Sequence, residues 1–140
     1  MSRGLRNRNP GNIRRSATRY KGEVESADTA FKSFETMAHG YRAIFVLLHT
    51  YHIKHGLTTA AEMIARYAPS VENNTQAYIS AVEQISGIPA TEPLDTLHAE
   101  SMMPIVSAIN RVENGVCASP AEVMRGWKMF ADDYSSSASK

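Results

Sequence analysis

One glutamate in this sequence stands where a carboxyl group could do acid chemistry. Glu113 follows an apolar helical segment over residues 105–112 and precedes Asn114-Gly115, a pair that indicates a helix end. The negative end of the helix dipole disfavours an ionised carboxylate, so the last turn of a helix suits a group that donates a proton. Cleavage of a glycosidic bond needs such a carboxylic acid to protonate the leaving oxygen. The other interpretation is an ordinary exposed carboxylate in a helix-end turn.

Two further glutamates could supply the same chemistry, because Glu25 and Glu35 border a possible β-hairpin over residues 23–34. Glu35 would lie at a helix N-terminus, where the dipole favours the ionised form, so it suits a second carboxylate better than an acid. Hydrolysis requires a second carboxylate at a defined separation, and no spacing in the sequence identifies that partner for Glu113. A transglycosylase could act with a single acid.

The sequence has neither a nucleotide-binding loop nor a Ser-His-Asp signature. His49, His52 and His55 recur at spacings of three, but no acidic residue stands between them in the zincin pattern. A polar stripe beside the core is therefore the better interpretation of these histidines. The single Cys117 excludes an intrachain disulfide and a cysteine-based zinc site. We expect neither a metal nor another cofactor.

The elements that must position these residues are mainly helical. Apolar side chains recur at spacings of three and four between capping residues in five stretches: residues 38–55, 59–67, 74–86, 97–113 and a last helix that begins after Ser119. Residues 1–22 carry turn chemistry, because Pro10 restricts φ and Gly11 admits a positive φ in the turn over residues 9–12. The 140 residues suit one domain over residues 1–134, followed by a flexible tail over 135–140.

The formal net charge of +1 hides a basic N-terminal arm. Seven cations precede the first acidic residue, Glu23: Arg3, Arg6, Arg8, Arg14, Arg15, Arg19 and Lys21. Such an arm would be attracted to a polyanion, either nucleic acid or an anionic cell-wall polymer or outer leaflet. The alternative is a solvated surface segment. Nucleic acid is the less favoured partner, because the arm has no recognisable binding motif and no interleaved aromatic residues.

No segment of the sequence predicts membrane insertion or export by a signal peptide. The longest apolar run, residues 43–48, is far too short to span a bilayer. The first residues are basic, but no apolar stretch follows them, so we expect no signal peptide. Export would then use a holin, a virion or a dedicated secretion machine.

Residues 3–14 read Arg-Gly-Leu-Arg-Asn-Arg-Asn-Pro-Gly-Asn-Ile-Arg, which resembles the opening R-G-x-R-N-x-N-P-G-N-I-R of a phage protein family. Members of that family are labelled virion structural proteins or lysozyme-like endolysins. The similarity extends to about residue 115, through residues 31–34, 40–43, 66–69, 72–78 and 111–115. Tyr20 and Tyr67 depart from the family, which has tryptophan at both positions, but tyrosine keeps an aromatic ring there. The resemblance implies a phage-associated, lysozyme-like protein.

A more distant similarity connects this chain with flagellar-type glucosaminidases and other lysozyme-like enzymes. Those enzymes carry a helix that ends in glutamate, an Asn-x-x-Gly-Ile-type turn, an aromatic-x-Gly segment and helices with an important tyrosine, in that order. Here the turn over residues 9–13, the segment 20–22 and the segment 74–78 follow in the same order. The helix that ends in Glu113 comes last, as a circular permutation would arrange it.

These resemblances imply roles for individual residues. Glu113 would be the general acid, and Tyr78 would orient the sugar or stabilise the charge that develops at the anomeric carbon. The residues implied to bind sugar, by hydrogen bonds or by stacking, are Asn9, Asn12, Asn74 and Tyr20. Read without the resemblance, the asparagines are turn or cap residues and Tyr78 is a core residue.

We therefore predict a mainly α-helical, lysozyme-like domain of about five helices with a small N-terminal hairpin or irregular lobe. The predicted function is a peptidoglycan-degrading glycosidase, either a muramidase or a lytic transglycosylase, that acts on peptidoglycan glycan strands. The protein would be associated with a virion, or exported to the periplasm or cell wall without a signal peptide. The alternative is a non-enzymatic virion structural protein that keeps the fold without the chemistry.

Overall fold

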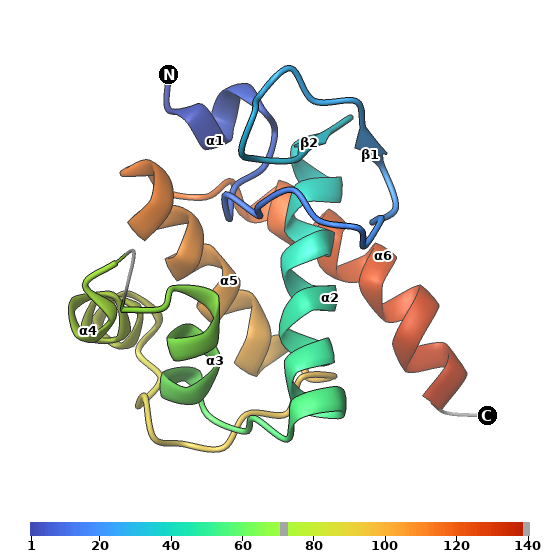
Figure 1. Cartoon of the computed structure of the whole chain (residues 1–140). Helices are drawn as coiled ribbons and strands as arrows, with labels where there is room; N and C mark the ends of the chain where they lie inside the picture. Colours follow the sequence, from blue (N-terminus) through green and yellow to red (C-terminus); the bar gives the residue numbers. More distant parts are fainter. Residues whose placement is uncertain (71–72, 139–140) are drawn as a thin grey trace.

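The computed structural model describes residues 1–70 and 73–138. This part of the chain is mainly helical, as predicted, with one two-stranded antiparallel sheet. The elements in chain order are α1 (Arg3–Arg6), β1 (Glu23–Val24), β2 (Ser33–Phe34), α2 (Met37–His55), α3 (Ala60–Tyr67), α4 (Thr75–Ser86), α5 (Ala99–Asn114) and α6 (Pro120–Ala138). Figure 1 shows α1, the sheet and their connections gathered at one end of the helical bundle, where they form a small N-terminal lobe.

The long helix α2 lies at the centre of the core. Four of its apolar side chains at spacings of three and four are almost fully buried, namely Tyr41, Ile44, Phe45 and Leu48, and α6 packs along this helix. The contact between these two helices is aromatic, since the Phe45 ring meets Trp127 edge-on with ring centroids 5.1 Å apart and lies 5.9 Å from Phe130. On the other side of the core α4 packs against α5, and α3 packs against α4.

The helix ends predicted from capping residues are confirmed. Thr59 and Glu62 form a reciprocal capping box at the start of α3, and Gly56, Gly87 and Gly115 end their helices in the left-handed conformation. The α5 helix consequently ends at Asn114, immediately after Glu113, where the sequence placed it.

Two features of the fold differ from the expectation. A short helix, α1, interrupts the N-terminal segment that carried only turn signals, and its first turn is capped by the Ser2 hydroxyl. At the other end α6 continues to Ala138, so residues 135–138 of the segment predicted as a flexible tail are helical, and its flexibility stays a prediction. Residues 139–140 of that tail lie outside the described residues.

The predicted hairpin over residues 23–34 is present, and Asn9 ties it to the turn that precedes it. The Asn9 side chain is fully buried. Its Nδ2 donates to the carbonyl oxygens of Ile13 (3.0 Å) and Lys32 (2.9 Å), and its Oδ1 accepts from the Ile13 backbone N–H (2.9 Å). One amide therefore satisfies three buried backbone groups from two different segments.

The basic N-terminal segment is folded against the domain and is not a free arm. Its Arg3 guanidinium donates to both oxygens of Asp28 at 2.6 and 2.7 Å, and with the backbone N–H of Ala30 it holds the pKa of that carboxyl well below its usual range. Lys21 lies 3.2 Å from Asp133 on α6. Several other cations of the segment remain exposed, so contact with a polyanion stays a prediction.

Within residues 1–70 and 73–138, none of the helices has the length and apolar character that crossing a membrane requires.

Replacing Asn9 by alanine should lower the free energy of unfolding by about 3 kcal/mol, because buried backbone groups lose their hydrogen-bond partners. Urea titration followed by circular dichroism measures this loss. Arg6→Ala is the matched control on the exposed side of the same segment and should change stability by less than about 0.5 kcal/mol. Equal stabilities for the Asn9 variant and the wild type would show that Asn9 does not hold the hairpin against the turn.

Candidate active site

Glu113 lies in the last turn of α5 and is half-buried. Its Oε1 accepts a hydrogen bond from Nδ2 of Asn12 at 2.7 Å, and its Oε2 accepts one from the hydroxyl of Tyr78 at 2.8 Å. The three side chains come from α5, the N-terminal turn and α4. The structure therefore brings together three of the residues singled out from the sequence, although Asn12 and Glu113 are 101 positions apart.

The turn that carries Asn12 is held against α5 by the residue after Glu113. Asn114 donates from Nδ2 to the Pro10 carbonyl oxygen at 2.9 Å, and its Oδ1 accepts from the Ser2 hydroxyl at 2.6 Å. Asn12 itself has a φ of 49°, in the left-handed region that asparagine tolerates better than most residues. This conformation and the Asn114 contacts together aim the Asn12 amide at Glu113.

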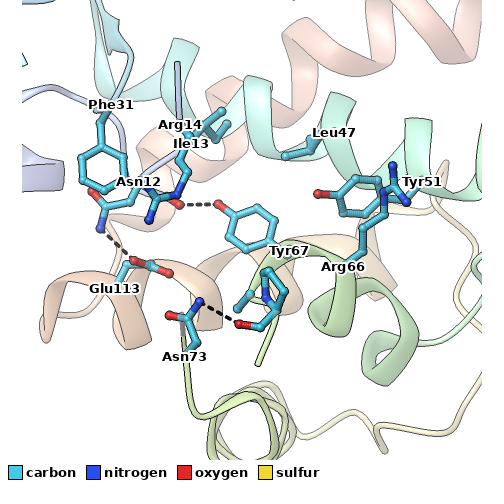
Figure 2. Close-up of a pocket in the computed structure, with 13 residues that line it drawn as sticks. Asn12, Ile13, Arg14, Phe31, Leu47, Tyr51, Arg66, Tyr67, Asn73 and Glu113 are labelled. Carbon is cyan, nitrogen blue, oxygen red and sulfur yellow. Dashed lines mark hydrogen bonds between the residues drawn. The ribbon is translucent and has the colours of Figure 1, made fainter. Parts of the chain in front are cut away.

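A cavity of about 340 Å³ opens beside these groups. Its walls come from the N-terminal turn, α2, the end of α3 with the residues that follow it, and α5; the lining residues are Gly11, Asn12, Ile13, Arg14, Phe31, Leu47, Tyr51, Arg66, Tyr67, Ala68, Pro69, Asn73 and Glu113. Figure 2 shows Phe31, Asn12 and Glu113 at one side of the cavity, Tyr51 and Arg66 at the other, and Tyr67 between them. The site thus combines amide, hydroxyl and aromatic groups around one carboxylate.

Tyr78 stands behind Glu113, and its ring is part of the core. It is only 7% exposed. Burial raises the pKa of Tyr78 well above its usual range, and the neighbouring Tyr67 and Glu113 add to the effect. Tyr78 therefore remains protonated across the physiological range and always has a proton to donate to Glu113. Tyr78 is therefore both a core residue, as expected from the apolar pattern, and a hydrogen-bond donor to Glu113.

Tyr67 is the central side chain of the cavity, and its hydroxyl donates to the carbonyl oxygen of Gly11. A Cβ on Gly11 would overlap that hydroxyl oxygen and would lie 2.9 Å from Ile44. The expectation of a positive φ at Gly11 is wrong, because within this turn Arg8 and Asn12 hold the positive φ values. Glycine is needed at this position because Tyr67 approaches the backbone too closely for any side chain.

Three of the residues proposed to bind sugar do not line the Glu113 cavity. Asn9 is fully buried and its amide is used by the backbone, so it has no group left for a ligand. Tyr20 is 9% exposed, packs on Phe34 and lines a separate cavity. Asn74 caps α4 by accepting from the Ala77 N–H at 3.1 Å, and its neighbour Asn73 lines the cavity instead.

The rival carboxylates do not lie at this cavity. Glu35 is exposed beside His39, and Glu25 lies on the hairpin at a separate pocket formed by the N-terminal lobe. Among the described residues Glu113 is the carboxylate that lines the Tyr67 cavity. No cluster of three or more His, Cys, Asp or Glu residues suited to a metal ion occurs within residues 1–70 and 73–138.

Sequence reasoning missed several residues of the site. Phe31, Arg66 and Tyr67 belong to segments that carried the family resemblance, but none was assigned a role. Asn73 was not among the residues named as candidates. Arg66, Tyr67 and Asn73 lie within three residues of Pro69 or Asn74, which mark the ends of helices, so position could have pointed to them. Phe31 has no such neighbour in the sequence.

The described chain is therefore a mainly α-helical protein with a carboxylate, held by an amide and a phenol, at the wall of a polar-aromatic cavity. No model of a known protein family matches it. It is 40% identical over 118 residues to "Protein P5" of Pseudoalteromonas phage PM2, and this match covers 81% of the present chain and 72% of the phage protein. The chain belongs to the same family as that phage protein.

The close contact between Gly11 and Tyr67 predicts that these two positions are energetically coupled. Gly11→Ala should destabilise the protein by about 1–3 kcal/mol, because the new methyl group overlaps the Tyr67 hydroxyl and presses on Ile44. In a Tyr67→Phe background the same substitution should cost about 1 kcal/mol less, since the nearest overlapping atom is gone. A double-mutant cycle of urea unfolding measures the coupling.

Tyr51→Phe supplies the control for that cycle, because Tyr51 lines the same cavity but is not among the nearest neighbours of a Cβ at Gly11. Its cycle with Gly11→Ala should give no coupling. Additivity in the Tyr67 cycle, or the same coupling in both, would refute the steric explanation for glycine.

Proposed function

We propose that this protein is a glycosidase of the bacterial cell wall with a lysozyme-like fold, either a muramidase or a lytic transglycosylase, and that Glu113 is its general acid. The observation that carries the proposal is the convergence of Asn12 and Tyr78 on the Glu113 carboxyl group at the wall of the cavity. A structural carboxylate in a helix-end turn would need neither the buried phenol nor the strained turn. Both are arranged around the group that would transfer the proton.

The two hydrogen bonds suit an acid that loses its proton in the reaction. As the glycosidic oxygen takes the proton, the carboxyl group of Glu113 becomes negatively charged. The Asn12 amide and the Tyr78 hydroxyl already point at its two oxygens, so their hydrogen bonds strengthen as the charge develops and cost no reorganisation. In this proposal Asn12 and Tyr78 are positioning residues that hold the acid and stabilise its ionised product.

The other walls of the cavity suit a sugar. Phe31, Tyr51 and Tyr67 offer aromatic surface for the apolar face of a pyranose ring, and the amide of Asn73 and the guanidinium of Arg66 offer polar contacts to hydroxyl or N-acetyl groups. A volume of about 340 Å³ lies at the lower end of the range for small-ligand sites, so the cavity would hold one part of a glycan strand while the rest lies outside.

Membership in a phage protein family supports the cellular setting of the proposal. A phage must cross or dissolve the cell wall of its host, and we propose that the protein acts there as part of the virion or after export. The competing function is a virion structural protein that uses the same fold without catalysis. The two are separated by whether purified protein releases products from peptidoglycan.

Glu113→Gln should lower the rate of peptidoglycan digestion by about 100-fold or more, because it removes the transferable proton and keeps the size of the side chain. The fold should stay intact, since the new carboxamide can accept from Asn12 through its oxygen and donate to the Tyr78 oxygen through its nitrogen. The measurement is digestion of purified peptidoglycan with mass analysis of the products. Reducing ends would identify a hydrolase, and anhydro ends would identify a transglycosylase.

Glu100→Gln is the matched control, because Glu100 lies in the first turn of the same helix and its side chain is 91% exposed. This variant should digest peptidoglycan at the wild-type rate. Wild-type activity in a folded Glu113→Gln protein would exclude Glu113 as the acid. Absence of any product from the wild-type protein would favour the virion structural function.

A further inference from the structure

A second cavity lies next to the Glu113 cavity and differs from it in charge. Its volume is about 320 Å³, and it is formed by the loop over residues 18–21, one face of α2 and the side chain of Tyr134 on α6. Leu47 lines both cavities, so they meet on the surface of α2. Figure 1 shows the chain after α1 crossing α2 towards α6 before it enters β1. Residues 11–14 of this segment line the first cavity, and residues 18–21 line the second.

Four cationic side chains line the second cavity: Arg19, Lys21, Arg42 and Lys54. Two of them belong to a stripe on α2, since Arg42, Val46, Thr50 and Lys54 follow one another at intervals of four and all reach the cavity. No carboxylate is part of the lining within the described residues. The cavity therefore presents concentrated positive charge next to the proposed catalytic cavity.

Arg42 is the fixed centre of this charge. It is only 6% exposed, and its NH2 group donates to Asp133 at 2.8 Å, whereas its buried Nε has no hydrogen-bond acceptor among the described residues. Asp133 also accepts a hydrogen bond from the Lys21 ammonium group at 3.2 Å, so two cations share this carboxylate. A guanidinium that is nearly buried and only partly neutralised favours an anion nearby more than a solvated one does.

We infer that the second cavity is a subsite for a carboxylate of the peptide that cell-wall glycan carries. The inference rests on the proposed function, because it assigns the neighbouring cavity to the sugar of the same polymer. Peptide stems bear free carboxylates and branch from the glycan at every second sugar. A cationic cavity beside a sugar site therefore matches the chemistry of this substrate. The protein would then prefer glycan that carries peptides over bare glycan.

The test uses a soluble cell-wall tetrapeptide with free carboxylates and measures its binding by titration calorimetry. Arg19→Ala combined with Lys54→Ala should weaken binding at least tenfold, because both side chains are exposed cations of the lining. The matched control is Arg125→Ala combined with Lys128→Ala, which removes the same charge from exposed positions of α6 outside the cavity and should leave affinity unchanged. The tetrapeptide with amidated carboxylates should bind at least tenfold more weakly to the wild-type protein.

Enzyme kinetics give a second readout. The Arg19→Ala, Lys54→Ala protein should show about a tenfold higher KM on peptide-bearing peptidoglycan with an unchanged kcat, and wild-type constants on glycan stripped of its peptides. Equal loss in the charge-matched control, equal binding of the amidated peptide, or tighter binding of inorganic phosphate than of the tetrapeptide would overturn the subsite. The last result would point to a phosphate polymer as the partner.

Failure of the subsite and failure of the proposed function give different results. If peptidoglycan yields no products but the tetrapeptide binds with the expected loss in the Arg19→Ala, Lys54→Ala protein, the subsite stands and the glycosidase proposal fails. If peptidoglycan is digested but the variant binds the tetrapeptide like the wild type, the subsite fails alone. Glu113→Gln should retain tetrapeptide binding, because Glu113 lies in the other cavity.

Discussion

The junction between the N-terminal turn and the end of α5 is the interaction on which the site depends. Asn114 holds the turn by its bond to the Pro10 carbonyl oxygen, and Asn12 returns from the turn to Glu113. Neither segment could position a carboxylate alone, because a helix end leaves its last side chains free to move in solvent. Closing the chain over about a hundred residues costs loop entropy, and this cost must be offset by the buried contacts of the N-terminal lobe.

The lobe obtains those contacts from polar groups as much as from apolar ones. Lys32 is almost fully buried, and its ammonium group donates to the Glu23 carboxylate and to the carbonyl oxygens of Ser16 and Thr18. Together with the Arg3–Asp28 pair, this network holds a segment with little regular structure in one conformation. A segment fixed in this way can line two cavities along α2, whereas a flexible basic arm would form neither.

The two cavities divide the chemistry of the molecule. The first contains a carboxylate held by two donors, with aromatic, amide and two arginine side chains around it, and the second is lined by four cations and no carboxylate among the described residues. If both belong to one substrate, as we propose, that substrate has a sugar part and a carboxylate-bearing part a short distance apart. The relationship to a phage protein is consistent with a polymer of the host cell surface.

The sequence alone determined the local structure of this protein. Helix periodicity and capping pairs such as Thr59 and Glu62 act between residues three or four apart, so the bounds of α2 to α5 could be predicted closely. The position of Glu113 in a last helical turn follows from the same local rules. Only the tertiary structure decided which polar side chains can take part in the site. Asn9 and Asn12 are three positions apart in one motif, yet Asn9 bonds to buried backbone groups and Asn12 bonds to Glu113. Asn9 bonds to Ile13 nearby and to Lys32 on the hairpin, whereas the partner of Asn12 is 101 positions away. The proximity of Asn12 and Glu113 depends on how the whole core packs, which no local pattern encodes.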